Sequence, residues 1–379
     1  MENILALYPP SYEASRRRFR ENLDRLKVFW PAASLFSHRL PGDEDLTIDR
    51  IEAPALTANE RVLVFTTGEH GIEGFVGSAM LQRFLDTILP QLDPATTGLI
   101  LVHAINPWGM AHRRRTNAAN VDLNRNFVLN PSELDPSFNP EFARLDACLT
   151  PAGEIHSLAD SERNFSNQFS ALVEELGRDA FWSAARLGQY FQPKGIHYGG
   201  DSLQAETSHL LQIYESALRD YAQILHLDIH TGYGPRYQMS LVNSVYEPRS
   251  SADLAARFDY PIVVAANPDE FYAILGDMVD CLYRLWERKY PHRRLYATAF
   301  EFGTFGETLE GQIRTLQTMI LENQAYWYGC SHAELENQVK TDFCELFAPS
   351  DAHWRVKAVE DADRAFAGIL QANGFVKNK

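Results

Sequence analysis

Short apolar runs that alternate with longer amphipathic segments limit the folds this sequence can adopt. The runs are rich in β-branched residues, which predicts strands: RVLVF (61–65), LILVHAI (99–105), QILHLDI (223–229), PIVVAA (261–266) and LYATAFEF (295–302). Helical spacing marks the longer segments, which span residues 74–89, 209–223, 275–290 and 307–327. Strands that alternate with helices predict an α/β fold, with a mixed, mostly parallel twisted sheet covered by helices on both faces.

The domain organisation follows from the length and from the absence of linkers. A chain of 379 residues could form one large α/β domain or two of ordinary size. The sequence contains no repeat, low-complexity tract or Gly/Ser-rich linker. The stretch NPSELDPSFNPEF (130–142) predicts a long loop, after which the pattern resumes. We therefore expect a single domain over residues 1–379, with a core at about 55–330 and peripheral helical extensions at both ends.

Charge and hydropathy exclude several classes of partner. The formal net charge of −15 would repel a nucleic-acid backbone. The basic run at residues 113–115 is too short for a nucleic-acid surface, although it could hold one small anion. No apolar stretch approaches the roughly 18 residues of a membrane helix, and no secretory signal is visible. The four cysteines are widely spaced, as in a reduced cytoplasmic protein.

The stretch TTGEHGIEGF (66–75) places His70 and Glu73 directly after a predicted strand. Such a pair is weak evidence alone, because a solvated turn, a helix cap or a hydrogen-bond partner would give the same pattern. Its position is stronger evidence, since turns at strand ends are where α/β proteins bind ligands. If the turn coils at Gly71, residues three apart fall on one side and both side chains could reach one ion.

A second candidate region is LHLDIHTGYG (225–234), which contains His226 and His230. On a helix these two histidines would form the pair of a zinc protease, but the period-two pattern predicts a strand. They then lie about 13 Å apart and cannot share a metal. We expect His226 in the core and His230 at the strand end. Catalytic zinc sites leave one position to water and take three protein ligands, a layout that His230 completes with the pair in the first region.

Two further regions supply polar groups for catalysis. The segment RRRTNAANVDLNRNF (113–127) concentrates arginines and amides, which suit the binding of a carboxylate or an oxyanion. Glu301 interrupts the apolar run ATAFEF, where a buried carboxylate is costly unless it is paired or used. Desolvation would raise its pKa and suit it to proton transfer. A solvated loop and an edge-strand glutamate remain the structural alternatives.

Together these four regions resemble the carboxypeptidase A superfamily of zinc metallopeptidases. The resemblance rests on HGIE (70–73), VDLNRNF (121–127), DIHTG (228–232) and EFGT (301–304), in the order of that family. It is strongest to an uncharacterised bacterial branch with HGxEG, NVDLNRNF, DxHTG and EFGT motifs. The resemblance implies a zinc carboxypeptidase-like fold in which His70, Glu73 and His230 bind zinc, while Asp122 orients His70.

The same resemblance implies roles for four residues around the metal. Asn124 and Arg125 would hold the substrate carboxylate, and Glu301 would be the general base. Arg114 would polarise the scissile carbonyl, with either neighbouring arginine as the alternative. Tyr233 would be one candidate for the pocket tyrosine of the family, beside Tyr198, and the sequence favours neither.

The function implied is a zinc-dependent metallocarboxypeptidase-like hydrolase that cleaves an amide or peptide bond next to a free carboxylate. The substrate would be a small peptide or an acyl amino acid. The alternative is an N-acyl amino acid amidohydrolase similar to aspartoacylase and succinylglutamate desuccinylase, whose motifs are related. A non-catalytic zinc-binding protein is a further alternative. A serine hydrolase is disfavoured because no GxSxG motif occurs.

Overall fold

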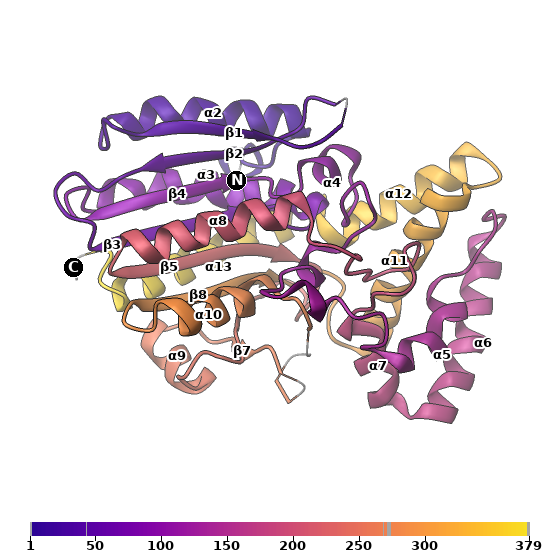
Figure 1. Ribbon diagram of the computed structural model, residues 1–379. Coiled ribbons are helices and arrows are strands. Elements are labelled where there is room, and N and C mark those ends of the chain that lie inside the picture. Colours follow the sequence, from indigo (N-terminus) through magenta and orange to yellow (C-terminus); the bar gives the residue numbers. More distant parts are fainter. Residues whose placement is uncertain (1, 43, 268, 271–273, 377–379) are drawn as a thin grey trace.

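The computed structural model describes residues 2–42, 44–267, 269–270 and 274–376, and Figure 1 shows its arrangement. These residues form an eight-stranded sheet in the order β1-β2-β4-β3-β5-β8-β6-β7. The strands are β1 (Ser34–Arg39), β2 (Thr47–Ala53), β3 (Arg61–Thr67), β4 (Thr97–His103), β5 (Gln223–Thr231), β6 (Met239–Asn243), β7 (Val263–Ala265) and β8 (Arg294–Phe302). All five predicted strands are present, and β1, β2 and β6 are additional.

The pairing of the strands is mixed. The central strands β4, β3, β5 and β8 run parallel to one another. Strand β2 pairs antiparallel with β4 on one side, and β6 pairs antiparallel with β8 on the other. The predicted α/β class with a mixed, mostly parallel sheet is confirmed.

Helices cover both faces of the sheet, because alternate strand residues enter two different cores. On β3, Leu63 and Phe65 pack into one core and Val62 and Val64 into the other. The helices are α1 (Glu2–Leu5), α2 (Tyr12–Lys27), α3 (Gly74–Thr87), α4 (Pro107–His112), α5 (Pro140–Leu149), α6 (Leu158–Leu176), α7 (Arg178–Leu187), α8 (Ala205–Asp220), α9 (Ser251–Phe258), α10 (Met278–Lys289), α11 (Leu309–Tyr328), α12 (Ala333–Phe347) and α13 (Ala352–Ala372). Helices α2, α3 and α13 cover the first face, and α8 and α10 cover the second.

A third group of helices lies beyond the carboxyl ends of the central strands. Helices α5, α6, α7, α11 and α12 pack around their own apolar core, at the right of Figure 1. Four short 3-10 turns connect the elements: η1 (Gly71–Glu73), η2 (Leu89–Gln91), η3 (Leu123–Arg125) and η4 (Pro131–Glu133). Because β3, β5 and β8 end at the same edge of the sheet, the turns that follow them meet between the sheet and these helices.

The prediction of peripheral, helical chain ends is wrong in two places. The first 55 residues contribute β1 and β2 to the sheet, where polar residues interrupt the apolar pattern of TIDRIEA and conceal the strand. Helix α13 packs into the main core through Trp354 and Phe366. The loop predicted at 130–142 is also shorter, since α5 begins at Pro140 with the Asn139 side chain as its N-cap.

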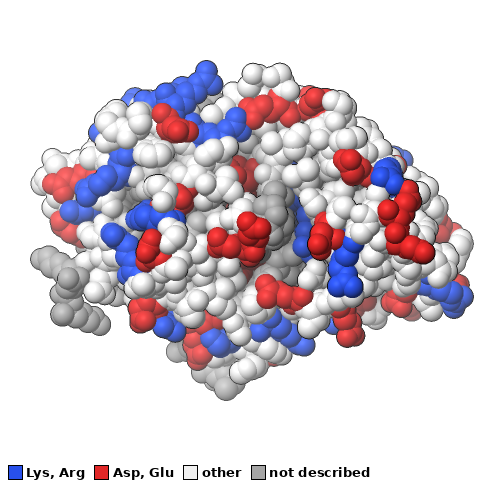
Figure 2. All heavy atoms as spheres, turned by 90° about the horizontal axis from the view of Figure 1, so that it is seen from below, with Lys and Arg blue, Asp and Glu red and all other residues white. Residues whose placement is uncertain are grey.

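The surface and the helices bear on the classes of partner considered above. On the face shown in Figure 2, acidic and basic side chains are mixed and no broad basic surface forms. None of the described helices is long and apolar enough to cross a bilayer. The cytoplasmic location stays a prediction.

Candidate metal centre and active site

Three parallel strands deliver the predicted site residues to one edge of the sheet. Strand β3 leads into the turn that carries His70 and Glu73, and β5 carries His230 as its second-last residue. Strand β8 lies beside β5 in a register that pairs His230 with Glu301. Side chains far apart in the sequence therefore meet because neighbouring parallel strands end together.

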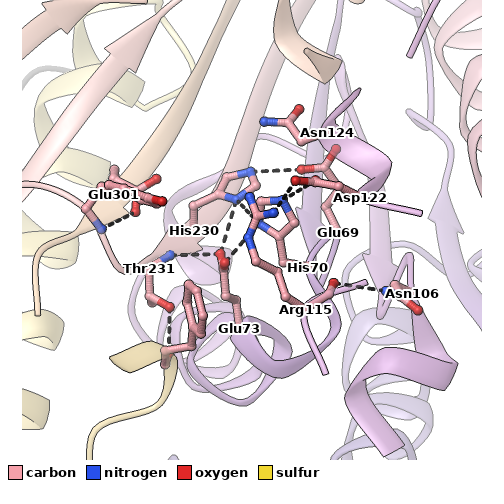
Figure 3. Close-up of polar contacts among 12 residues, drawn as sticks. Glu69, His70, Glu73, Asn106, Arg115, Asp122, Asn124, His230, Thr231 and Glu301 are labelled. Carbon is pink, nitrogen blue, oxygen red and sulfur yellow. Dashed lines mark hydrogen bonds and ion pairs between the residues drawn. The ribbon is translucent and has the colours of Figure 1, made fainter. Parts of the chain in front are cut away.

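The three predicted metal ligands converge (Figure 3). The Nδ1 atom of His70 lies 2.8 Å from Glu73 Oε1, and the Nδ1 atom of His230 lies 3.2 Å from Glu73 Oε2. The two Nδ1 atoms are 3.3 Å apart. All three side chains are buried. Each histidine thus turns the same ring nitrogen toward one carboxylate.

The outer nitrogens of both histidines contact carboxylates of their own. His70 Nε2 lies 3.0 Å from Asp122 Oδ1, and His230 Nε2 lies 2.5 Å from Asp228 Oδ2. Such carboxylates fix the orientation of metal-binding histidines. The predicted contact between Asp122 and His70 is present, whereas sequence reasoning gave Asp228 no role although it belongs to the same DIHTG motif.

Electrostatic interactions at the centre favour a protonated His230 beside an ionised Glu73. Burial disfavours the charged form of His230, but Asp228 and Glu73 outweigh it and raise the pKa of the imidazole well above its usual value. Burial would raise the pKa of Glu73, yet the neighbouring His70 and His230 lower it to about 2. Glu73 is therefore a carboxylate at neutral pH.

This donor set fits a zinc ion. Two imidazole nitrogens and one carboxylate are the ligands that catalytic zinc sites use, and the outer nitrogen of each imidazole is held in place. Gly71 lets the turn approach α4 closely, because a Cβ atom there would lie 2.1 Å from the carbonyl carbon of Gly109. The backbone packing thus fixes the turn that carries the ligands.

Glu69 is a buried acid of the centre for which the sequence predicted no role. Its Oε2 atom lies 3.4 Å from His230 Nε2, and together with His70 and His230 it forms a cluster able to hold a metal ion. Burial raises the pKa of Glu69 well above its usual value. Its carboxyl lies against the outer nitrogen of His230, whereas Glu73 lies against the inner one.

Glu301 occupies the edge of the centre, as predicted from its place in an apolar strand. Its Oε1 atom accepts a hydrogen bond of 3.1 Å from the Tyr233 backbone N–H. Burial, and then the charge of Glu73, raise the pKa of Glu301 to about 8. The carboxyl is thus held by one backbone donor and favours the protonated form more than an exposed glutamate does.

The structure corrects the assignment of the arginine. The Arg114 guanidinium turns away from the metal centre toward α11, where its Nε donates to Glu322 Oε1 at 2.8 Å and its Cζ atom lies 3.6 Å from the centre of the Tyr326 ring. Arg115 instead pairs with Asp122 and lines the cavity beside the ligands. A buried guanidinium requires a partner, and the two arginines find theirs on opposite sides of the segment.

Asn124 and Arg125, the predicted substrate-binding residues, occupy different depths. The side chain of Asn124 lines the cavity, while its Nδ2 donates to Asp277 Oδ2 at 3.1 Å. Arg125 lies behind it, with Nη1 donating to the Asn124 carbonyl at 3.1 Å and Nη2 to the Arg186 carbonyl at 2.6 Å. It is absent from the described cavity lining.

A family model matches residues 8–361, which is most of the chain. The chain belongs to the DUF2817 family, described as proteins of unknown function. No curated protein matches.

Solved structures of several hydrolases match this member of DUF2817. Carboxypeptidase A from Helicoverpa armigera is 15% identical, with a TM-score of 0.45 and coverage of 89% of this chain and 74% of that chain. Bovine thrombin-activatable fibrinolysis inhibitor is 13% identical, with a TM-score of 0.42 and coverage of 87% and 95%. A succinylglutamate desuccinylase from Silicibacter sp. TM1040 is 14% identical, with a TM-score of 0.37 and coverage of 78% and 67%. At these TM-scores, the function must be inferred from the side chains of the chain itself.

The cavity of this DUF2817 protein beside the predicted ligands is small and is lined by both polar and apolar residues. Its volume is about 30 Å³. Its described lining comprises His70, Glu73, Arg115, Asn124, His230, Thr231, Tyr233, Val242, Ile274, Asp277, Met278, Val279, Ala299 and Glu301. Sequence reasoning missed Asp277, which precedes α10 and carries no motif, whereas Tyr233 was one of two tyrosine candidates. Tyr198 is not among the described residues that line the cavity.

Proposed function

We propose that this DUF2817 protein is a zinc-dependent hydrolase that cleaves an amide or peptide bond next to a free carboxylate. The observation that carries the proposal is the convergence of His70, Glu73 and His230, with Glu301 beside them in the same cavity. A protein that only binds zinc would need the three ligands but not Glu301. A buried carboxyl beside the metal is suited to proton transfer, which favours an enzyme.

His70, Glu73 and His230 would hold the zinc ion. Zinc bound by such ligands supplies a Lewis acid and lowers the pKa of a coordinated water molecule to about 7. Glu301 accepts the proton of the attacking water in its carboxylate form, which the positive charge of a bound zinc ion would favour, and then passes the proton to the leaving amine. The Tyr233 N–H keeps Glu301 in position through Oε1.

Arg115 takes the role that the sequence assigned to Arg114. Its guanidinium faces the cavity and is anchored by Asp122, so it can donate to the carbonyl oxygen as negative charge develops there. Asn124, which also lines the cavity, supplies an amide to the substrate. Arg125 donates a hydrogen bond to the backbone carbonyl of Asn124 and so helps to position Asn124. It acts on the substrate through that residue.

The small cavity also favours a second candidate, the N-acyl amino acid amidohydrolase. A volume of about 30 Å³ accommodates a short group more readily than the side chains of an extended peptide. Both candidates use the same metal centre and the same base. They differ in which side of the amide the cavity recognises.

A substrate panel separates these functions. The zinc-loaded protein is assayed with short peptides beside N-succinyl and N-acetyl amino acids, and Glu301→Gln serves as the inactive control. We expect release of a C-terminal amino acid that depends on Glu301. Hydrolysis of acyl amino acids alone would replace the peptidase by the amidohydrolase. Stoichiometric zinc without any Glu301-dependent hydrolysis would identify a non-catalytic zinc-binding protein.

A further inference from the structure

Two of the three consecutive arginines lie outside the metal centre and border a second cavity. Arg113 and Arg114 line a space of about 410 Å³ between α4, α11 and α12. Arg115, the next residue, faces the metal centre on the other side of the same segment. The volume lies within the range of small-molecule sites, about 300–1,000 Å³.

The positive charge of Arg113 is not balanced at this cavity. Its Nη2 donates to the Pro10 carbonyl at 3.1 Å, its Nη1 lies 3.9 Å from Cys344 Sγ, and its guanidinium stands 4.9 Å from the centre of the Phe75 ring. Within the described chain, no carboxylate lies within 4.0 Å of it. Arg113 also adopts a left-handed backbone conformation, with φ of 55°. Such strain in a non-glycine residue persists where the surroundings impose it, often at binding sites.

The other cations of the cavity are already paired. Arg114 is bonded to Glu322, and Lys340 is paired with Glu336. Arg114 nevertheless keeps one group unused, because its buried Nη1 has no hydrogen-bond partner among the described residues. Buried polar atoms are rarely left in that state. Among the described residues, the cavity therefore has one guanidinium without a carboxylate partner, that of Arg113, and one unsatisfied donor, the Nη1 of Arg114.

The remaining wall is aromatic and apolar. The rings of Trp108 and Tyr326 meet edge to face, with centroids 6.3 Å apart. Val339 and Phe343 of α12 close the cavity and are themselves buried. His112 stacks on Trp108 and Arg114 lies over the Tyr326 ring, so a flat ligand ring would pack against a remaining face or edge of these rings.

We propose that this cavity is a second binding site, which takes a small carboxylate bearing an aromatic ring. The ring packs against Trp108 and Tyr326, and the carboxylate pairs with Arg113. The sequence already indicated that the basic run could hold one small anion, and the structure assigns that anion to the side facing away from the metal.

The cavity wall is joined directly to the turn that carries the metal ligands. The backbone N–H of Ile72 donates to the Arg114 carbonyl at 3.0 Å, and that of Gly71 donates to the Arg115 carbonyl at 3.2 Å. A ligand in the second cavity thus contacts a segment that supports the metal centre. Binding itself is independent of the proposed hydrolase function.

Calorimetric titration of the zinc-loaded protein with phenylacetate tests the site. We expect saturable binding with a Kd near or below about 1 mM, and no comparable binding of neutral phenylacetamide. Arg113→Gln should weaken phenylacetate binding about tenfold, which corresponds to about 1.4 kcal/mol. Ala325→Trp, which fills the cavity from α11, should abolish it. Arg178→Gln, at an exposed arginine of α7, is the matched control and should bind as the wild type does.

Three results would overturn the proposal. They are no binding of phenylacetate by the wild type, equal binding of the neutral amide, and unchanged affinity in both Arg113→Gln and Ala325→Trp. The last result would place the anion elsewhere, including at the metal centre. Because Arg113→Gln changes an exposed side chain, it keeps the test decisive if Ala325→Trp does not fold.

Discussion

Strand β5 carries two buried histidines that lie in very different surroundings. His226, in the middle of the strand, has hydroxyl groups as its polar partners among the described residues: Thr66 Oγ1 lies at 2.9 Å and Tyr214 OH at 3.1 Å from its Nε2. His230, at the end of the strand, contacts Asp228 and Glu73. Burial lowers the pKa of His226 to about 4, whereas the carboxylates raise that of His230 well above its usual value.

The difference shows which features distinguish the proposed metal ligand from a core histidine. Both side chains are nearly inaccessible, so burial does not distinguish them. The distinction is position, because only the strand end meets the turns after β3 and β8. The neighbouring groups increase the difference between the two histidines. Carboxylates hold His230 in the orientation that a metal would need, whereas neutral hydroxyls stabilise His226 as a core residue.

The largest effect should come from replacing the histidine at the strand end. If the proposed metal centre is correct, His230→Ala should lose stoichiometric zinc and all hydrolysis, because it removes one of the three proposed protein ligands. Metal analysis of the purified variant measures this directly. His226→Ala is the matched control and should retain zinc. Full zinc content in His230→Ala would remove this histidine from the ligand set.

A change at Glu301 should separate metal binding from catalysis. We expect Glu301→Gln to bind zinc as the wild type does, while kcat falls by about 10²–10⁴-fold, the usual contribution of a general acid or base. The amide keeps the shape of the side chain and can still accept the Tyr233 hydrogen bond. Zinc content and steady-state kinetics on the same sample provide the test. Normal turnover would show that another group moves the proton.

Asp228 connects the two histidine environments, so its replacement should have an intermediate effect. Its Oδ2 atom contacts His230, and its Oδ1 atom accepts a hydrogen bond from Thr66, which also contacts His226. We expect Asp228→Asn to weaken zinc affinity about 10–100-fold, as for other carboxylates that orient ligating histidines. Competition with a chelator measures the affinity, and Thr66→Val, which removes only the hydroxyl, should change it less. Equal affinities for Asp228→Asn and wild type would show that His230 needs no such support.

Sequence patterns predicted the central strands and brought together His70, Glu73 and His230, because both predictions depend on local signals. Apolar runs mark strands that are buried on both faces, and HGIE and DIHTG place the proposed ligands directly at strand ends. The edge strand β1 and its neighbour β2 were missed because β1 is largely exposed and polar residues interrupt the apolar pattern of β2. Arg114 was predicted to face the metal centre, but Arg115 lines the cavity instead, because their orientations depend on distant partners, Glu322 and Asp122, which no local pattern reveals.

The smallest predicted effect concerns the stability conferred by the core histidine. The pKa of His226 is lowered to about 4 in the folded protein, so the unfolded chain, with a histidine pKa of about 6.5, binds more protons below that value. The contribution of neutral His226 to the free energy of unfolding is therefore fully present above about pH 6.5 and declines as the pH falls toward 4. Between about pH 7 and about pH 5, the free energy of unfolding should fall by about 2 kcal/mol less in His226→Gln than in the wild type. Urea unfolding at the two pH values measures the difference, and parallel losses in both proteins would mean that His226 titrates normally in the fold and differs from His230 in position alone.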